Sequence, residues 1–192
     1  MSTTKINYSI RDLEAADIPT LVKLDVEVSN ALLPDLEPYD ESWIKSITLP
    51  SRTSNHHWFC KTAAAVDNDN GPIGFALCKY MLNGCFSRRK NSNSSNLNHR
   101  KKRRASYIDL FLLVVDSKHR NHGVGKKLIE TVLKKGEAMK DVKSIRLHVL
   151  EHNKDAYRLY KRMGFTQMGN IRKNYPAKGY NYYRMVYDLF DK

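Results

Sequence analysis

Short stretches of alternating or continuous apolar residues recur along the chain and predict seven β-strands. These stretches are 8–13, 57–66, 73–82, 107–115, 144–150, 165–171 and 180–190. Four other segments carry apolar residues at helical spacing, and we expect helices at 18–28, around 43–47, at 124–133 and at 153–163. In the second half of the chain, strands and helices alternate over short connections. This order predicts an α/β (α+β) fold in which right-handed crossovers build a mixed central sheet.

Proline, glycine and capping residues agree with these bounds. Asp17 precedes Ile18 and Pro19, which indicates a helix cap followed by proline in the first turn. Segment 67–72 reads Asp-Asn-Asp-Asn-Gly-Pro and predicts a turn that joins two strands into a hairpin. Gly164 stands at a C-cap position after the last helix. Turn chemistry and apolar periodicity therefore place the ends of these elements consistently.

Segment 87–105 differs from the rest of the chain in composition. It holds eight basic residues, a run of Asn and Ser and no acidic residue, so it cannot build a core. We expect a disordered basic insertion within a single domain that spans residues 1–192. Its eight charges account for most of the net charge of +13. A solvated loop, a nuclear targeting signal and a weak contact with nucleic acid remain open as interpretations.

Cysteine usage and hydropathy exclude several classes of protein. Cys60, Cys78 and Cys85 form no C-x-x-C pair, and we expect neither a disulfide framework nor a bound metal. The first residues contain no apolar signal region, and no run approaches the roughly 18 apolar residues of a membrane span. The sequence predicts a soluble protein of a reducing compartment, in the cytoplasm or the nucleus.

A glycine-rich turn at residues 120–125, Arg-Asn-His-Gly-Val-Gly, leaves a buried strand and opens a helix. Such a turn gathers unpaired backbone N–H groups at the positive end of the helix dipole, an arrangement that suits a pyrophosphate. Arg120 and Lys126 add fixed positive charge. Taken alone, the pattern is also typical of an ordinary strand-to-helix turn.

Two motifs together carry a resemblance to a known family. Residues 115–125 resemble the acetyl-CoA signature of the Gcn5-related N-acetyltransferases (GNAT), and residues 153–165 are similar to that family's N-x-x-A-x-x-L-Y-x-x-x-G-F stretch. The resemblance implies the GNAT fold, with about seven strands, four helices and two parallel strands that splay around acetyl-CoA. It implies these cofactor-binding residues: Leu113, Val114, Val115, Arg120, Asn121, His122, Gly123, Val124, Gly125, Lys126, Asn153 and Tyr160.

The resemblance also implies a chemistry in which an amine attacks the bound thioester directly. Tyr160 lies where the family commonly carries the acid that protonates the leaving thiolate. Two residues are candidates for the base that takes a proton from the amine. His148 matches the base position of acetyltransferases that act on protein N-termini, and Asp109 lies where the histone-acetylating branch carries a Glu. The sequence leaves open which of the two is the base.

The tyrosine-rich tail bears on the identity of the amine. Segment 172–175, with Tyr180, Tyr182 and Tyr183 after it, resembles the loop that covers the peptide N-terminus in N-terminal acetyltransferases. Pro176 stands where that loop has a second tyrosine. Tyr175 and Tyr182 are therefore candidate substrate-binding residues, together with Leu33 near the end of the first helix.

The leading hypothesis is acetylation of a protein or peptide α-amine, with the ribosome or an auxiliary subunit as a candidate partner. A polyamine acceptor would need acidic residues such as Asp35, Glu37, Asp40 and Glu41. A histone-type lysine acceptor is the third alternative. A non-enzymatic adaptor for the ribosome or nucleic acid, which would use the basic residues 100–104, is the fourth.

Overall fold

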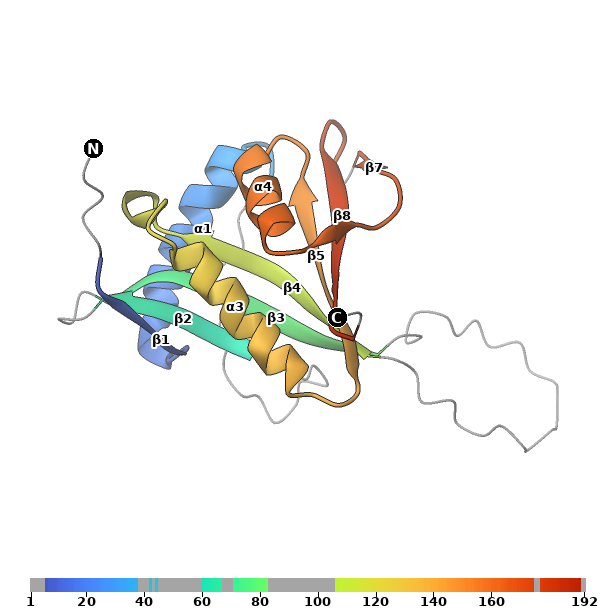
Figure 1. Ribbon diagram of the computed structural model, residues 1–192. Coiled ribbons are helices and arrows are strands. Elements are labelled where there is room, and N and C mark those ends of the chain that lie inside the picture. Colours follow the sequence, from blue (N-terminus) through green and yellow to red (C-terminus); the bar gives the residue numbers. More distant parts are fainter. Residues whose placement is uncertain are drawn as a thin grey trace, which may run out of the picture.

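The computed structural model describes residues 6–37, 42, 44, 60–66, 71–82, 106–174 and 177–190. These residues form one mixed eight-stranded sheet with helices on both faces (Figure 1). Of the helix expected around 43–47, only Ser42 and Ile44 are described, and both are helical. The expected basic insertion at 87–105 and the candidate substrate residue Tyr175 lie outside the described residues.

Strands occupy all seven segments in which the sequence predicts them, and an eighth is added. They are β1 (Tyr8–Asp12), β2 (Cys60–Val66), β3 (Pro72–Leu82), β4 (Ser106–Val115), β5 (Val142–Leu150), β6 (Thr166–Gln167), β7 (Arg172–Lys173) and β8 (Asn181–Asp188). The strand expected at 165–171 is reduced to the two residues of β6. Gly169 bends the chain there with a φ of 68°, which explains why the strand stops early.

Three of the predicted helices are described: α1 (Ile18–Leu32), α3 (Val124–Glu137) and α4 (Lys154–Arg162). Pro19 lies in the first turn of α1, as the sequence predicts. Short 3₁₀ turns precede α1 at Ala15–Asp17 and α3 at Ser117–His119. No described helix has both the length and the apolar character needed to cross a membrane.

The strand order is β1-β2-β3-β4-β5-β8-β6, and β7 pairs with β8. The predicted hairpin of β2 and β3 is confirmed, because the two strands pair antiparallel. Among the pairings that the described strands make, that of β4 with β5 alone is parallel. The predicted mixed sheet is thus confirmed, and its two antiparallel halves meet along one parallel seam.

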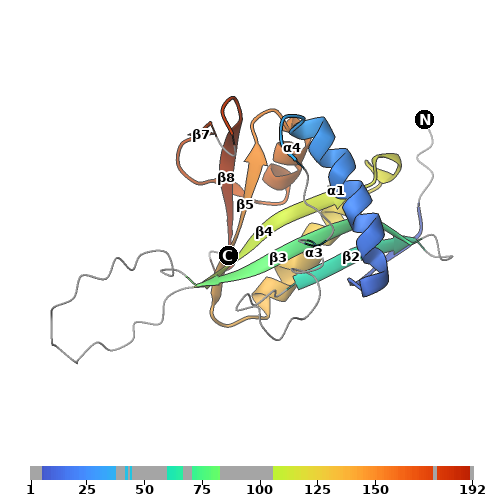
Figure 2. The same ribbon diagram turned by 180° about the vertical axis from the view of Figure 1, so that it is seen from behind.

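Each face of the sheet carries its own hydrophobic cluster. α3 lies across the front face in Figure 1, and α1 crosses the opposite face, which Figure 2 turns toward the viewer. Leu128, Ile129 and Val132 of α3 are fully buried in the first cluster. Leu21 of α1 and Phe75 of β3 are fully buried in the second. Burial of a side chain of this size contributes about 1.5–3 kcal/mol, so packing against the sheet holds both helices in place.

The β4–β5 pairing ends early and opens a fork in the sheet. The last paired residues are Leu110 on β4 and Leu147 on β5. Both strands continue past this point, β4 to Val115 and β5 to Leu150. We call the region beyond the last pair the fork. The splayed parallel pair that the family resemblance implies is therefore present.

A β-bulge accompanies the fork on the other side of β4. Cys78 of β3 lies opposite Leu110 and Leu77 lies opposite Leu112, so two residues of β3 face three of β4. A bulge of this kind bends its strand and turns the following side chains. The bulge thus lies next to Leu110, the residue at which the pairing of β4 with β5 ends.

Candidate active site

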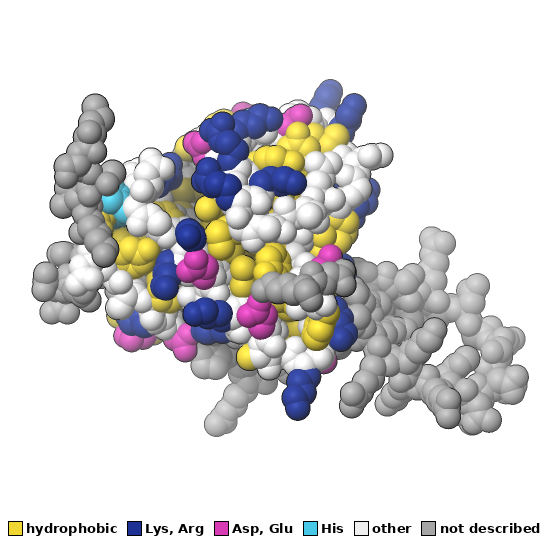
Figure 3. Space-filling model, viewed as in Figure 1, with side chains coloured by type: hydrophobic (Ala, Val, Ile, Leu, Met, Phe, Trp, Pro, Cys, Tyr) yellow, Lys and Arg dark blue, Asp and Glu magenta, His cyan; other side chains and the backbone are white. Residues whose placement is uncertain are grey.

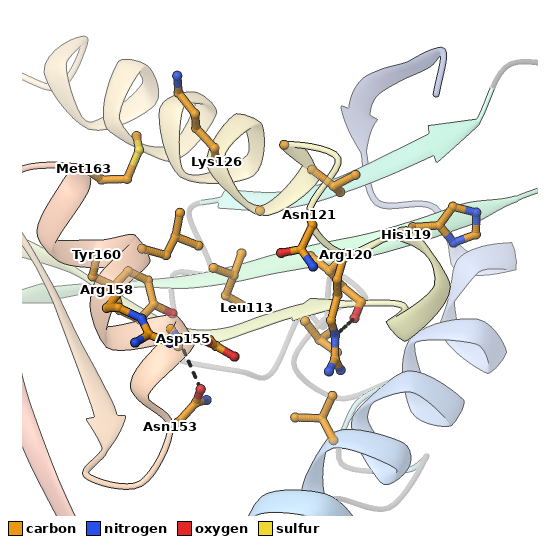
Figure 4. Close-up of a pocket in the computed structure, with 18 of the residues that line it drawn as sticks. Leu113, His119, Arg120, Asn121, Lys126, Asn153, Asp155, Arg158, Tyr160 and Met163 are labelled. Carbon is orange, nitrogen blue, oxygen red and sulfur yellow. Dashed lines mark hydrogen bonds and ion pairs between the residues drawn. The ribbon is translucent and has the colours of Figure 1, made fainter. Parts of the chain in front are cut away.

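A cavity of about 900 Å³ lies at the fork. α1, the end of β4, the loop after it, the first turn of α3 and one side of α4 line this cavity (Figure 4). Its volume lies within the range of roughly 300–1,000 Å³ that is usual for small-molecule and cofactor sites. The elements that the two sequence motifs occupy thus surround one space.

The loop from Asp116 to Gly123 is held by its own hydrogen bonds. The Asp116 carboxylate accepts a bond of 2.9 Å from the Lys118 backbone N–H. Arg120 Nε donates to the Val115 carbonyl oxygen at 3.1 Å, which ties the loop to the end of β4. Asn121 has a left-handed φ of 64°, a conformation that Asn adopts more readily than most residues. The loop is therefore pre-shaped before any ligand binds.

Gly123 forms the N-cap of α3 with a φ of 83°, where a side chain would strain the backbone. No side chain caps this helix, and its first turn contains no acidic residue. The N–H groups of the first turn and the positive end of the helix dipole are therefore available to an anion. At Gly125 a Cβ would lie 3.4 Å from Leu159 Cδ2, an ordinary contact, so packing alone does not require glycine there.

The cavity receives most of the residues that the sequence predicts for the cofactor. The lining contains Leu113, Val114, Val115, Arg120, Asn121, Gly123, Val124, Gly125, Lys126, Asn153 and Tyr160. His122 is absent from this lining, and its Nδ1 lies 2.7 Å from the Arg120 carbonyl oxygen, so it braces the loop. The helix N-terminus, the glycines and the basic residues fit a pyrophosphate, and the apolar end of β4 fits an extended chain.

Sequence reasoning missed several residues of the lining. Val28, Ala31 and Leu32 come from the last two turns of α1. Arg158 and Arg162 add two guanidinium groups from α4. The spacing of Val28 and Leu32 marks them as one helix face, but only the folded chain shows which element that face meets.

Asn153 has a second role that its motif did not reveal. Its Oδ1 accepts a hydrogen bond of 3.2 Å from the Ala156 N–H and caps α4. Such a cap typically contributes about 1 kcal/mol to stability. Because the Asn153 side chain also lines the cavity, the start of α4 and the ligand site are fixed by the same residue.

Tyr160 is buried on α4 and lines the cavity. Burial raises the pKa of its hydroxyl far above the ordinary value of 10, and the nearby Cys78 raises it further. The Tyr160 ring packs edge-on to Phe165, with centroids 5.8 Å apart. The hydroxyl is thus protonated at any working pH, and it can donate a hydrogen bond into the cavity.

His148 and Asp109 lie beside one another on the sheet but outside the cavity lining. Asp109 pairs with Arg146, and His148 follows two residues later on the same face of β5. His148 is also the first residue of β5 beyond the last parallel pair, so it stands at the fork. The ring of Tyr182, a predicted substrate residue, meets the His148 ring edge-on with centroids 4.8 Å apart.

Burial and nearby charges shift the pKa values of these two groups. Partial burial lowers the pKa of His148 below 6.5, Asp109 opposes this shift, and Arg184 adds to it. Burial raises the pKa of Asp109, against the opposing charges of His148, Lys79 and Arg146. At neutral pH His148 is therefore an uncharged imidazole, the form that can accept a proton.

The end of α1 contacts the neighbouring loops on the other side of the fork. Tyr180 donates from its hydroxyl to the Asp35 carboxylate at 2.8 Å. His152 donates from Nε2 to the Leu32 carbonyl oxygen at 3.0 Å. Leu33, the predicted substrate residue, caps α1 one position beyond Leu32 and does not line the cavity. Neither contact is evident from the sequence, because 120 or more residues separate the partners.

Comparison with known proteins agrees with this geometry. The model described as the acetyltransferase (GNAT) family matches residues 13–165. N-alpha-acetyltransferase 30 of Saccharomyces cerevisiae is 30% identical over 141 residues, which cover 71% of this chain and 69% of that protein. Histone acetyltransferase MCC1 of Arabidopsis thaliana is 27% identical over 126 residues, which cover 65% of this chain and 49% of that protein.

A solved structure has the same fold. The crystal structure of Arabidopsis thaliana NAA60 in complex with acetyl-CoA superposes with a TM-score of 0.69 at 22% identity, over 95% of this chain and 99% of that chain. The family match extends from just before α1 to just after α4 and so includes every element around the cavity. The chain therefore belongs to the acetyltransferase (GNAT) family.

Proposed function

We propose that this protein transfers the acetyl group of acetyl-CoA to the N-terminal α-amine of a protein or peptide. Membership of the acetyltransferase family supports the reaction type. The loop before α3, with Arg120 and the uncapped helix N-terminus, supports a coenzyme whose pyrophosphate binds there. The likeness to N-alpha-acetyltransferase 30 supports an α-amine as the acceptor.

The observation that carries the proposal is the neutral His148 at the fork. An α-amine has a pKa near 8, whereas a lysine side chain has one near 10.4. A base whose own pKa lies below 6.5 can deprotonate the first far more readily than the second. The histidine at this position therefore favours a chain-end amine over a lysine.

Three groups of this chain would act on the reactants. His148 accepts the proton of the acceptor ammonium, directly or through one water, while the Asp109 carboxylate stabilises the resulting imidazolium. Beyond Leu110 the backbone of β4 has no β5 pairing, so its N–H groups can bind the oxygen of the attacked carbonyl. Tyr160 lines the cavity with a protonated hydroxyl, and in this proposal it donates a hydrogen bond to the leaving sulfur. The coenzyme supplies the activated acyl thioester.

An acetyl-transfer assay with matched acceptors tests the proposal. The panel consists of peptide pairs. One member of each pair has a free N-terminus and no lysine, and the other has the same sequence except for a blocked N-terminus and one internal lysine. A histone-tail peptide and a polyamine complete it. We expect the free α-amines to react at least ~10-fold faster in kcat/KM, because they need less help to lose a proton. Mass spectrometry locates the added acetyl group.

A faster reaction with the blocked lysine peptides or the polyamine would overturn the α-amine assignment. The likeness to histone acetyltransferase MCC1 favours lysine as the second candidate acceptor. A polyamine acceptor would need the acidic groove that the sequence suggests, but Asp35 of that groove already accepts a hydrogen bond from Tyr180. Of the other acids expected in such a groove, 40 and 41 lie outside the described residues.

The pH profile gives an independent prediction for Asp109→Asn. Activity falls at low pH as His148 becomes protonated, and the Asp109 carboxylate favours that protonated form. Removing the carboxylate therefore lowers the pKa of His148, and the acid limb of kcat/KM moves to lower pH. Measuring wild type and variant with one peptide between pH 5 and 8 cancels the titration of the peptide amine. A limb that stays in place, or activity lost at every pH, contradicts this role for Asp109.

A further inference from the structure

The cationic side chains around the cavity form two groups. Arg120 belongs to the loop before α3, whereas Arg158 and Arg162 belong to α4. Figure 4 shows Arg120 on the side of the cavity next to α1 and Arg158 on the α4 side, with Lys126 on α3. Figure 3 shows dark blue side chains gathered over the region of α3 and α4. The two groups therefore lie on different sides of the cavity.

The cationic side chains of the two groups differ in the contacts that they already make with other groups of the protein. Arg120 is built into its loop through the bond of its Nε to the Val115 carbonyl, and it stands beside the N-terminus of α3. That position fits the pyrophosphate. Lys126 forms an ion pair with Glu130, and its Nζ lies 3.8 Å from the Glu130 carboxylate.

Arg158 and Arg162 form a pair on α4. They are four residues apart, so their side chains project from adjacent turns of one helix face. Arg158 makes an ion pair of 2.5 Å with Asp155, but these side chains are 66% and 91% exposed. An exposed pair of this kind contributes little and leaves further guanidinium N–H groups for a ligand. Within the described part of the chain, no carboxylate pairs with Arg162.

Coenzyme A carries a phosphate besides its pyrophosphate, attached to the 3′ oxygen of the ribose. Such a monoester holds between one and two negative charges at neutral pH, and its three terminal oxygens match the paired donors of a guanidinium. If the pyrophosphate binds at the N-terminus of α3, the 3′-phosphate must find its cationic partners elsewhere. The rim of the cavity on the α4 side offers the cations that it needs.

We propose that Arg158 and Arg162 bind the 3′-phosphate of coenzyme A and thereby select the coenzyme over its 3′-dephospho form. This inference rests on the proposed use of acetyl-CoA. The inner cavity, with Tyr160 and the end of β4, holds the acyl end independently of these arginines. The two arginines contribute to affinity and coenzyme choice rather than to the chemical step.

Calorimetric titration with coenzyme A and with 3′-dephospho-coenzyme A tests this site without using activity. We expect wild type to bind coenzyme A at least ~10-fold more tightly, since charge-assisted hydrogen bonds to a phosphate are strong. In Arg158→Gln/Arg162→Gln the preference should fall to within ~2-fold of equality, while the affinity for the dephospho form stays nearly constant.

The matched control is Lys154→Gln/Lys161→Gln. It removes the same two charges from the same helix, at exposed positions that do not line the cavity. This variant should retain the preference of wild type at each salt concentration, so a general loss of positive charge cannot explain the result.

Each other outcome has a defined meaning. If wild type binds both compounds equally, or if the arginine variant weakens both equally, the arginines do not read the 3′-phosphate and the inference is wrong. If the lysine control loses the preference as well, the inference is also wrong. If wild type binds neither compound, the proposed use of acetyl-CoA fails, and this inference fails with it.

Discussion

Replacing His148 with alanine should lower kcat/KM for an α-amine peptide by about 10²-fold or more, which is the usual contribution of a general base. The affinity for coenzyme A, measured by calorimetry, should not change, because His148 does not line the cavity. Its side chain is in contact with solvent, so the variant should unfold within a few degrees of wild type.

Imidazole added to the His148→Ala enzyme is the control for this prediction. A small base that enters the vacated space should restore part of the activity, and the restored rate should follow the unprotonated fraction of the added imidazole. If the alanine variant keeps its activity, His148 is not the base. Asp109 is the base instead if two results hold together. The His148→Ala variant would lose activity at low pH over the same range as wild type, and the Asp109→Asn variant would be inactive.

Replacing Tyr160 with phenylalanine should lower kcat by about 10–100-fold, with little change in KM for acetyl-CoA. The change removes the hydroxyl and leaves the ring, which packs on Phe165. Burial keeps this hydroxyl protonated, so it donates a hydrogen bond across the working pH range. A donor that acts as the sulfur leaves stabilises the transition state more than bound reactants and therefore affects kcat.

Tyr157→Phe is the matched control for Tyr160. Tyr157 lies on the same helix, but its ring packs on Tyr183 at 4.9 Å and does not line the cavity. The control should retain nearly full kcat. Equal rates for the two variants would show that Tyr160 is a core residue without a role in the reaction.

Local chemistry explains which parts of the fold were predictable. α3 and α4 have a clear apolar face, a glycine or asparagine cap and a glycine or turn at the end, all within about 15 residues. β4 is a nearly continuous apolar run, which is typical of a strand covered on both faces. β5 instead places Lys143, Arg146 and His148 between buried apolar residues, a pattern typical of a strand with one more open face. The length of β6 was overestimated, because an alternating pattern of apolar residues does not reveal a bend such as that at Gly169. β7 has two exposed residues and no apolar pattern at all.

The candidate site was predictable only where a motif is local. The loop with Gly123 and the helix with Asn153 and Tyr160 line the cavity as expected. The fork was not readable from residue patterns, since it depends on where pairing between two strands stops. Val28 and Arg158 were missed for the same reason, because their roles depend on which neighbour the fold brings near.

The single parallel seam has a consequence for how the enzyme must assemble. The loop that suits the pyrophosphate follows β4 on one half of the sheet, whereas His148 and Tyr160 belong to the other half. Five residue pairs, from Ser106 with Val142 to Leu110 with Leu147, join the two halves along the seam. Neither half contains all the groups that the proposed mechanism uses. The enzyme should therefore be active only when both halves of the sheet are folded and paired. Loss of activity during unfolding should follow the unfolding of the whole domain.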